Sequence, residues 1–266
     1  MKKNIHDIIL VGAGNVATHL GRELNHHFRI KQVYSRSVIP ARKLADLPQT
    51  NYTTDLIQLD YSADVYLFCL QDDALLPVLR STRFDDQLLI HTSGSQPMSV
   101  FKGFSKNYGV LYPVQTFTMD RIISLENVPV CIEGNNPENN EILEYIGLSI
   151  SGKVMKMDSD KRKILHLSAV FACNFSNHMY ALAEKLLKEN DMDFELLKPL
   201  ILETANKIEY HSPVAGQTGP AVRGDTEIIQ DHIGLLANSP ELQKIYTFVS
   251  NSIASISGEK ESENRT

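Results

Sequence analysis

Residues 7–24, DIILVGAGNVATHLGREL, decide how the chain folds. They open with a continuous apolar run at 8–11, which is typical of a strand buried on both faces of a sheet. A turn with two glycines follows, and the apolar residues after it recur with helical spacing. The stretch therefore predicts a strand, a tight turn and a helix, which together begin a βαβ unit.

Each small residue of the turn has a physical reason. Gly12 permits the sharp change of direction, Gly14 lets a pyrophosphate approach the backbone, and Ala17 lets the helix pack closely on the strand. The N–H groups at the start of a helix attract phosphate oxygens, so we expect Gly12, Gly14, Asn15 and Val16 to hold a dinucleotide's diphosphate. A glycine turn of another α/β protein is the alternative, but the strand before and the helix after are the context of the dinucleotide fingerprint.

The end of the second predicted strand indicates which dinucleotide binds. An NAD site usually has an acidic residue about 20 positions after the glycines, where it binds the ribose 2′-hydroxyl. This chain has Ser35, Arg36 and Ser37 there instead. A guanidinium can hold a 2′-phosphate with two parallel hydrogen bonds. The sequence therefore predicts NADP rather than NAD, the alternative being that Arg36 is only a solvated loop residue.

Composition excludes several classes of protein. The net charge of −6 and the pI near 5.8 give no basic surface for nucleic acid or an anionic membrane. The N-terminus leads directly into the first strand, and no apolar run approaches membrane-spanning length. Cys69, Cys131 and Cys173 are odd in number and lie in apolar contexts, which predicts buried thiols rather than disulfides. We expect a cytoplasmic protein whose partner is a small-molecule substrate.

Further apolar runs predict more strands of the same sheet, at 64–70, 87–91, 109–113 and 128–132, with a short helix at 40–47. Asp72 or Asp73 is expected to cap a further helix, which follows the strand at 64–70, with Pro77 near its first turn. Strands that alternate with helices indicate a Rossmann-type, doubly wound, mostly parallel α/β sheet. Ligands bind beyond the carboxyl ends of such strands. The residues expected there, beside a nicotinamide, are Leu70, Gln71, Ser93 and Gly94.

The second half of the chain is helical in period. A last edge strand is expected at 153–157, which ends a Rossmann-like domain at residues 1–157. An all-helical domain is expected at 158–257, with helices at 160–190, 193–210, 225–237 and 240–257. The first of these is apolar over so much of its surface that it indicates a central helix or a dimer core. Residues 258–266 are polar and charged, which is typical of a disordered tail.

Two segments of the helical half place polar groups in an apolar pattern. His166 and Asn174 are expected on one broad face of the long helix, where they could orient and protonate a substrate. The alternative is a core histidine with a hydrogen-bonding partner. In the turn at 217–226, Arg223 could bind a substrate carboxylate or pair with Asp225. Tyr112 and His232 are weaker candidates, and no motif predicts a metal site or a serine nucleophile.

Together these segments resemble one family, the bacterial NADP-dependent oxidoreductases with a Rossmann-like domain and a helical C-terminal domain of unknown function. The resemblance covers almost the whole chain and rests on VGAGNVA, YSRS, HTSG, YPVQTF, LHLSAVFACNF and TGPAVRGD. More distantly, the plan is similar to pyrroline-5-carboxylate reductase, ketopantoate reductase and the 6-phosphogluconate dehydrogenase superfamily. That similarity implies a homodimer through the helical domain and a substrate site in the cleft between the domains.

Two positions depart from the wider superfamily. Its hydroxyacid dehydrogenases have a lysine four residues before the asparagine of the long helix, where this chain has Val170 before Asn174. Tyr112 stands where many relatives have histidine, which argues against a catalytic role at that position. We expect His166 to take over the polar role of the missing lysine. The resulting hypothesis is hydride transfer between NADP and a small carbonyl or imine, and the alternative is an NADP(H)-binding regulator without catalysis.

Overall fold

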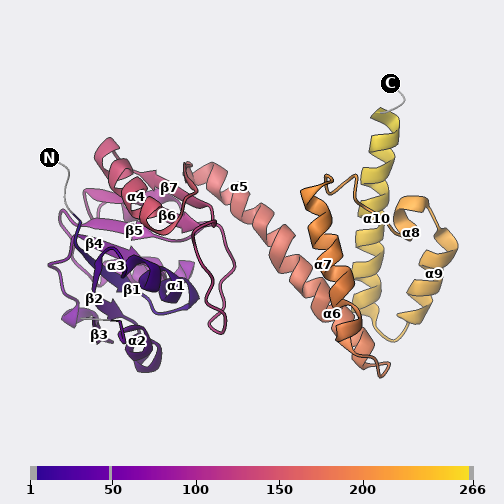
Figure 1. Ribbon diagram of the computed structural model, residues 1–266, viewed down its shortest axis with the longest axis horizontal. Coiled ribbons are helices and arrows are strands. Elements are labelled where there is room, and N and C mark those ends of the chain that lie inside the picture. Colours follow the sequence, from indigo (N-terminus) through magenta and orange to yellow (C-terminus); the bar gives the residue numbers. More distant parts are fainter. Residues whose placement is uncertain (1–4, 48–49, 264–266) are drawn as a thin grey trace. The chain divides into compact units, whose positions relative to one another are not determined.

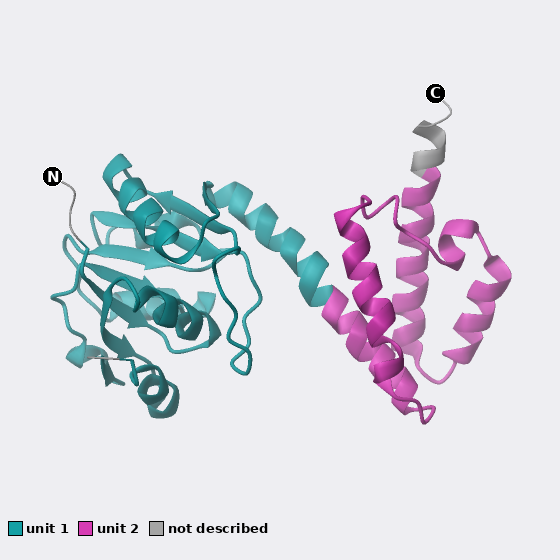
Figure 2. Cartoon of the chain, viewed as in Figure 1, with its two compact units in different colours: residues 1–175 teal, residues 176–266 magenta. Residues whose placement is uncertain are grey.

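The computed structural model describes residues 5–47 and 50–263. The chain divides into two compact units, residues 1–175 and residues 176–266 (Figure 2). The division falls inside the predicted long helix, whereas the last strand of the sheet ends near the predicted domain boundary at residue 157. None of the helices in the described ranges is long and apolar enough to cross a membrane.

The first unit contains one eight-stranded sheet in the order β3-β2-β1-β4-β5-β6-β7-β8 (Figure 1). All neighbouring strands are parallel except β6 and β7, which are antiparallel. The mostly parallel, Rossmann-type sheet predicted from the sequence is therefore confirmed. The strands are β1 (Asp7–Val11), β2 (Arg29–Tyr34), β3 (Asn51–Thr53), β4 (Val65–Phe68), β5 (Leu88–His91), β6 (Asn107–Pro113), β7 (Val130–Gly134) and β8 (Val154–Lys156).

Helices cover both faces of this sheet. Ile8 and Leu10 of β1 pack in one buried cluster with α1 and α4, and Ile9 and Val11 pack in a second cluster with α3. Side chains alternate between the faces of a strand, so a continuous apolar run is what two covered faces require. The helical segments are α1 (Asn15–Leu24), α2 (Val38–Leu44), η1 (Leu56–Gln58), α3 (Asp72–Arg80), η2 (Met98–Phe101) and α4 (Pro137–Ile150).

Some local predictions for this unit need correction. Gln71, rather than Asp72 or Asp73, is the N-cap of α3, and its side chain makes no capping hydrogen bond. Pro77 lies inside α3 rather than in its first turn. Strand β3 and helix α4 were not predicted, because β3 is only three residues long and α4 has a weak apolar periodicity.

The predicted long helix is present but is not regular. It consists of α5 (Ser159–Ala169), a π-helical segment η3 (Val170–Phe175) and α6 (Ser176–Lys188) (Figure 1). A π-helix closes its hydrogen bonds five residues apart instead of four. The rotation of about 100° per residue, on which the expected common face of His166 and Asn174 is based, therefore does not hold across η3.

The second unit is helical, as predicted. Its elements after α6 are η4 (Phe194–Leu196), α7 (Lys198–Asn206), η5 (Lys207–Glu209), α8 (Pro220–Arg223), α9 (Thr226–Leu235) and α10 (Pro240–Glu263). The short α8 lies in the segment that was predicted as a turn. Helix α10 continues into the segment for which a disordered tail was predicted, and residues 264–266 lie outside the described residues.

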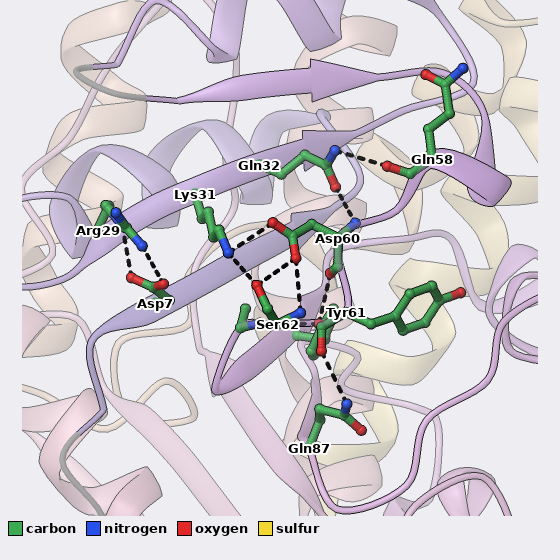
Figure 3. A network of polar contacts seen from close by, with 11 residues as sticks. Asp7, Arg29, Lys31, Gln32, Gln58, Asp60, Tyr61, Ser62 and Gln87 are labelled. Atoms are coloured by element: carbon green, nitrogen blue, oxygen red, sulfur yellow. Dashed lines mark hydrogen bonds and ion pairs between the residues drawn. The ribbon is translucent and has the colours of Figure 1, made fainter.

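Polar side chains join the amino ends of β1, β2, β4 and β5 (Figure 3). Arg29 binds Asp7 across β1 and β2, and Lys31 Nζ lies 2.8 Å from Asp60 Oδ2. Burial raises the pKa of Asp60, but hydrogen bonds from Lys31 and Ser62 outweigh burial and lower it to about 2. This network fastens the segment before β4 at the edge of the sheet opposite the carboxyl ends.

Candidate functional site

The glycine turn between β1 and α1 has two glycines with different roles. Gly12 has φ +121, and a Cβ there would lie 2.3 Å from the carbonyl oxygen of Cys69. The fold itself therefore requires glycine at this position. Gly14 has φ −85 as the N-cap of α1, and an added Cβ would meet nothing within 4 Å. The fold does not require glycine at position 14, so the open space beside the helix N-terminus fits a bound group rather than a packing need.

The first turn of α1 is suited to an anion. It contains no acidic residue, and Gly14 and Asn15 are exposed. Val16 is partly buried and packs against the core, so its backbone N–H rather than its side chain faces the helix end. Asn15 Nδ2 donates to the carbonyl oxygen of Phe117 at 2.8 Å. An amide NH₂ has two N–H donors, so this bond leaves capacity for a second acceptor.

The predicted 2′-phosphate residues follow β2, directly beside the glycine turn. Gly12 N donates to the carbonyl oxygen of Tyr34 at 2.7 Å, which holds the two loops together. Ser37 N donates to Ser35 Oγ at 3.3 Å, and Arg36 is exposed. Within residues 5–47 and 50–263, Arg36 makes no ion pair. A guanidinium with flanking hydroxyls is therefore available at this end of the sheet.

The residues predicted beside the nicotinamide lie at the carboxyl ends of β4 and β5, the next strands after β1 in the sheet. Leu70 comes within 3.3 Å of a Cβ added to Gly12. Gln71 is exposed at the start of α3. Ser93 accepts from the backbone N–H of Ser95 at 3.1 Å, which closes the turn around Gly94. The structure thus brings these residues to one edge, together with the glycine turn.

His91 shapes the turn that carries Ser93 and Gly94. The backbone N–H of Ser93 donates to His91 Nδ1 at 3.2 Å. Burial and the nearby Arg162 guanidinium lower the pKa of His91 to about 3. His91 is therefore neutral near neutral pH, and its role here is that of a structural acceptor.

His166 lies at the same edge, against Gly94. A Cβ added to Gly94 would lie 2.7 Å from the ring atoms Cγ and Nδ1 of His166, so only glycine leaves room for the imidazole. The hydroxyl of Tyr112 lies 3.1 Å from His166 Nδ1. Burial raises the pKa of Tyr112, which keeps the phenol protonated at ordinary pH. The protonated phenol can therefore donate to Nδ1 in the tautomer of the ring that carries its proton on Nε2.

A buried ion pair fixes the helix that carries His166. Arg162 Nη1 lies 2.6 Å from Glu133 Oε2 on β7, and the arginine side chain is 1% exposed. Arg162 Nη2 also donates to the carbonyl oxygen of Gln96 at 2.5 Å. Leu165, which precedes His166, packs on Tyr112 and Cys131. These contacts join α5 to β7 and to the loop after β5, and so set the position of His166.

Two other predicted residues are not joined to this group. Asn174 is exposed in η3, and it makes no hydrogen bond with His166 in the described part of the chain. Arg223 pairs with Asp225, Nη2 to Oδ2, at 2.7 Å, which is the structural alternative considered for that motif. Cys173 is exposed, so the prediction of a buried thiol is wrong there, whereas Cys131 is buried and Cys69 is partly buried.

The sequence did not reveal the partners of His166. The sequence makes Tyr112 only a weak candidate, and it contains no motif that points to Arg162 or Glu133. The only signal for Arg162 is its position four residues before His166, and therefore on the same face of α5. No spacing rule connects Tyr112 with His166, since the two are 54 residues apart.

The chain is similar to a family of known sequences and to several solved structures. A family described as Domain of unknown function (DUF2520) matches residues 128–253. A solved structure described as a "putative NADP oxidoreductase" from Bacteroides fragilis is 42% identical, with a TM-score of 0.89, over 94% of this chain and 98% of its own. A comparison with curated proteins finds no match.

Two more distant structures show the same fold. A Thermotoga maritima protein is 22% identical, with a TM-score of 0.79, over 94% of this chain and 99% of its own. A reductive aminase from Aspergillus terreus was solved with NADPH and ethyl levulinate. It is 13% identical, with a TM-score of 0.72, over 96% of this chain and 98% of its own. The identity and coverage of the Bacteroides protein show that this chain belongs to the family of NADP oxidoreductase-like proteins that combine a Rossmann-type N-terminal domain with a helical C-terminal DUF2520 region.

Proposed function

We propose that this protein is an NADP(H)-dependent oxidoreductase that moves a hydride between the nicotinamide and the carbonyl or imine carbon of a small metabolite. The observation that carries the proposal is the arrangement along one sheet edge. The open glycine turn, Arg36 and the His166–Tyr112 pair all lie at the carboxyl ends of adjacent strands or directly beside them. Ligands of open α/β sheets bind at that edge.

NADP(H) is proposed as the cofactor because two groups of residues match its phosphates. The open space at Gly14 and the helix N-terminus suit a diphosphate, and exposed Arg36 with Ser35 and Ser37 suits a 2′-phosphate. The Bacteroides relative is described as a "putative NADP oxidoreductase", and the Aspergillus reductive aminase was solved with NADPH. When bound, the nicotinamide would supply or accept the hydride.

The chain's own residues would manage the proton. Reduction of a C=O or C=N group adds a hydride to carbon and a proton to oxygen or nitrogen, and we assign that proton to His166. A hydroxyl can both donate and accept, so Tyr112 can pair with Nδ1 in either protonation state of the ring. Tyr112 would thereby hold the imidazole in one orientation while His166 gives up and regains a proton.

Asn174 is proposed to orient the substrate, although it makes no hydrogen bond with His166 among the described residues. Its support is its place in η3, because π-helical segments occur frequently at functional sites. The expected location of the substrate between the domains stays a prediction.

We also propose that the helical unit forms a homodimer. Large apolar side chains are exposed on its helices, among them Leu200 (62%), Ile208 (66%) and Phe248 (76%). Exposed apolar side chains in this number fit an interaction site, and two-fold homodimers are the commonest assembly.

The test of the enzymatic role is a panel of small aldehydes, ketones and imines, followed by NADPH absorbance. We expect His166→Ala to lower turnover at least about 100-fold while NADPH affinity stays within about 2-fold, since general acid catalysis contributes about 10²–10⁴-fold. Undiminished turnover of the variant with a real substrate would falsify the role of His166. NADPH binding without turnover of any substrate would favour a regulator.

A further inference from the structure

A loop between β6 and β7 is fastened to the first turns of α1, and we call its residues 115–121 the strap. The carbonyl oxygen of Phe117 accepts a hydrogen bond from Asn15 Nδ2 at 2.8 Å. The rings of Phe117 and His19 pack with their centres 4.6 Å apart. The carbonyl oxygen of Arg121 lies 3.2 Å from His19 Nε2. The loop and α1 lie side by side in Figure 1.

His19 of α1 takes part in the contact with the strap through its ring nitrogens. His19 is 1% exposed, and its Nδ1 lies 2.8 Å from the carbonyl oxygen of Asn15. Both ring nitrogens therefore face carbonyl oxygens, and the tautomer of the ring decides which of them donates. In the tautomer that donates from Nδ1 to the carbonyl oxygen of Asn15, the contact between Nε2 and the carbonyl oxygen of Arg121 is not a hydrogen bond. The other contacts that hold the strap are the packing of Phe117 on His19, the hydrogen bond from Asn15, and a contact of Thr18 Oγ1 with Met119 Sδ at 3.7 Å.

The strap lies beside the N-terminus of α1, where the dinucleotide is proposed to bind. Its hydrogen-bond donor, Asn15, is the first residue of α1, where the proposed function places the diphosphate. The strap begins just after the carboxyl end of β6, the strand that ends with Tyr112 and Pro113. The loop therefore leads from the residue that contacts His166 to the helix end that would bind phosphate.

We propose that the strap forms the outer wall of the dinucleotide site and closes over the diphosphate, so that the contact between Phe117 and His19 sets how fast the dinucleotide leaves. The inference rests on the proposed function. Asn15 connects the two, because one of its amide N–H groups holds the strap and the other can donate to a phosphate oxygen. The ligand class is a dinucleotide diphosphate, and nothing in the strap addresses the substrate.

Hydrogen exchange on the intact, unmodified protein gives the first test. Saturating NADPH should slow exchange of the backbone amides at 115–121 at least about 5-fold, along with those of the glycine turn at 12–16. Slower exchange at 12–16 with unchanged exchange at 115–121 would overturn the strap and leave the cofactor proposal standing. No change at either segment, together with no binding heat, would remove both proposals.

Release kinetics give the second test. Phe117→Ala removes the ring that packs on His19, so the rate constant for NADPH dissociation, followed by stopped-flow fluorescence, should rise at least about 10-fold. Thr118→Ala changes an exposed neighbour in the strap and should stay within about 2-fold. A Phe117→Ala protein that is folded by circular dichroism and releases NADPH at the wild-type rate would contradict the proposal.

Discussion

The two compact units bury their apolar side chains to very different degrees. In the first unit, strand residues such as Ile9, Leu10 and Leu89 are fully buried between the sheet and its helices. Among the described residues of the helical unit, only Ala221 and Leu242 are buried hydrophobic residues. Leu235 there is 83% exposed.

The difference shows that only one unit completes its own core. A sheet covered on both faces removes its apolar side chains from water within one chain. Helices with exposed apolar faces gain that burial only by association. The sheet unit therefore accounts for stability within the chain, and the helical unit is where we propose that a second copy contributes.

Breaking an ion pair should lower the free energy of unfolding much more in the sheet unit than in the helical unit. Glu133→Ala leaves the guanidinium of Arg162 buried without its partner, which should lower the free energy of unfolding by about 3–5 kcal/mol. Asp225→Ala breaks an ion pair whose side chains are 58% and 34% exposed, and it should cost less than about 1 kcal/mol. Urea denaturation of both variants measures the two values, and equal losses would break the comparison.

Charge on an apolar surface should affect the two units differently. Phe248→Lys places a charge on the proposed dimer surface, so the molar mass by light scattering should fall to that of one chain and Tm should drop by several degrees. Ile57→Lys is the control, because Ile57 is 90% exposed in the sheet unit. We expect no change of mass for it. A dimer that survives Phe248→Lys would argue against this surface.

Acid should destabilise the sheet unit through Asp60. Its folded pKa of about 2 lies below the ordinary value of 3.8, so the unfolded chain takes up the proton first. The stabilisation is therefore complete above about pH 5 and is lost as the pH falls from about 4 to 2. Asp60→Asn should cost about 1–2 kcal/mol at pH 7 and almost nothing near pH 2. A cost that does not change with pH would contradict this reading.

The sequence predicted much of the sheet unit because local rules determine it. Gly12 and Gly14 follow a strand and precede a helix, and the apolar run at 8–11 is what two covered faces require. The place of Arg36 just after β2 could be predicted because chain position alone fixes it.

The partners of His166 could not be predicted because they depend on tertiary structure. Tyr112 reaches His166 only because β6 lies beside β5 and Leu165 docks on that strand. The π-helical segment between His166 and Asn174 could not be predicted either, because a periodicity argument assumes a regular α-helix. Contacts of the strap with α1 likewise join segments about a hundred residues apart.

Calorimetric titration of the intact protein with NADPH and NADH tests the central claim most directly. We predict binding of NADPH, at least about 10-fold weaker binding of NADH, and loss of that preference in Arg36→Ala, because the guanidinium is the group that would meet the 2′-phosphate. Absence of binding heat and of thermal stabilisation with either dinucleotide at millimolar concentration would contradict the account.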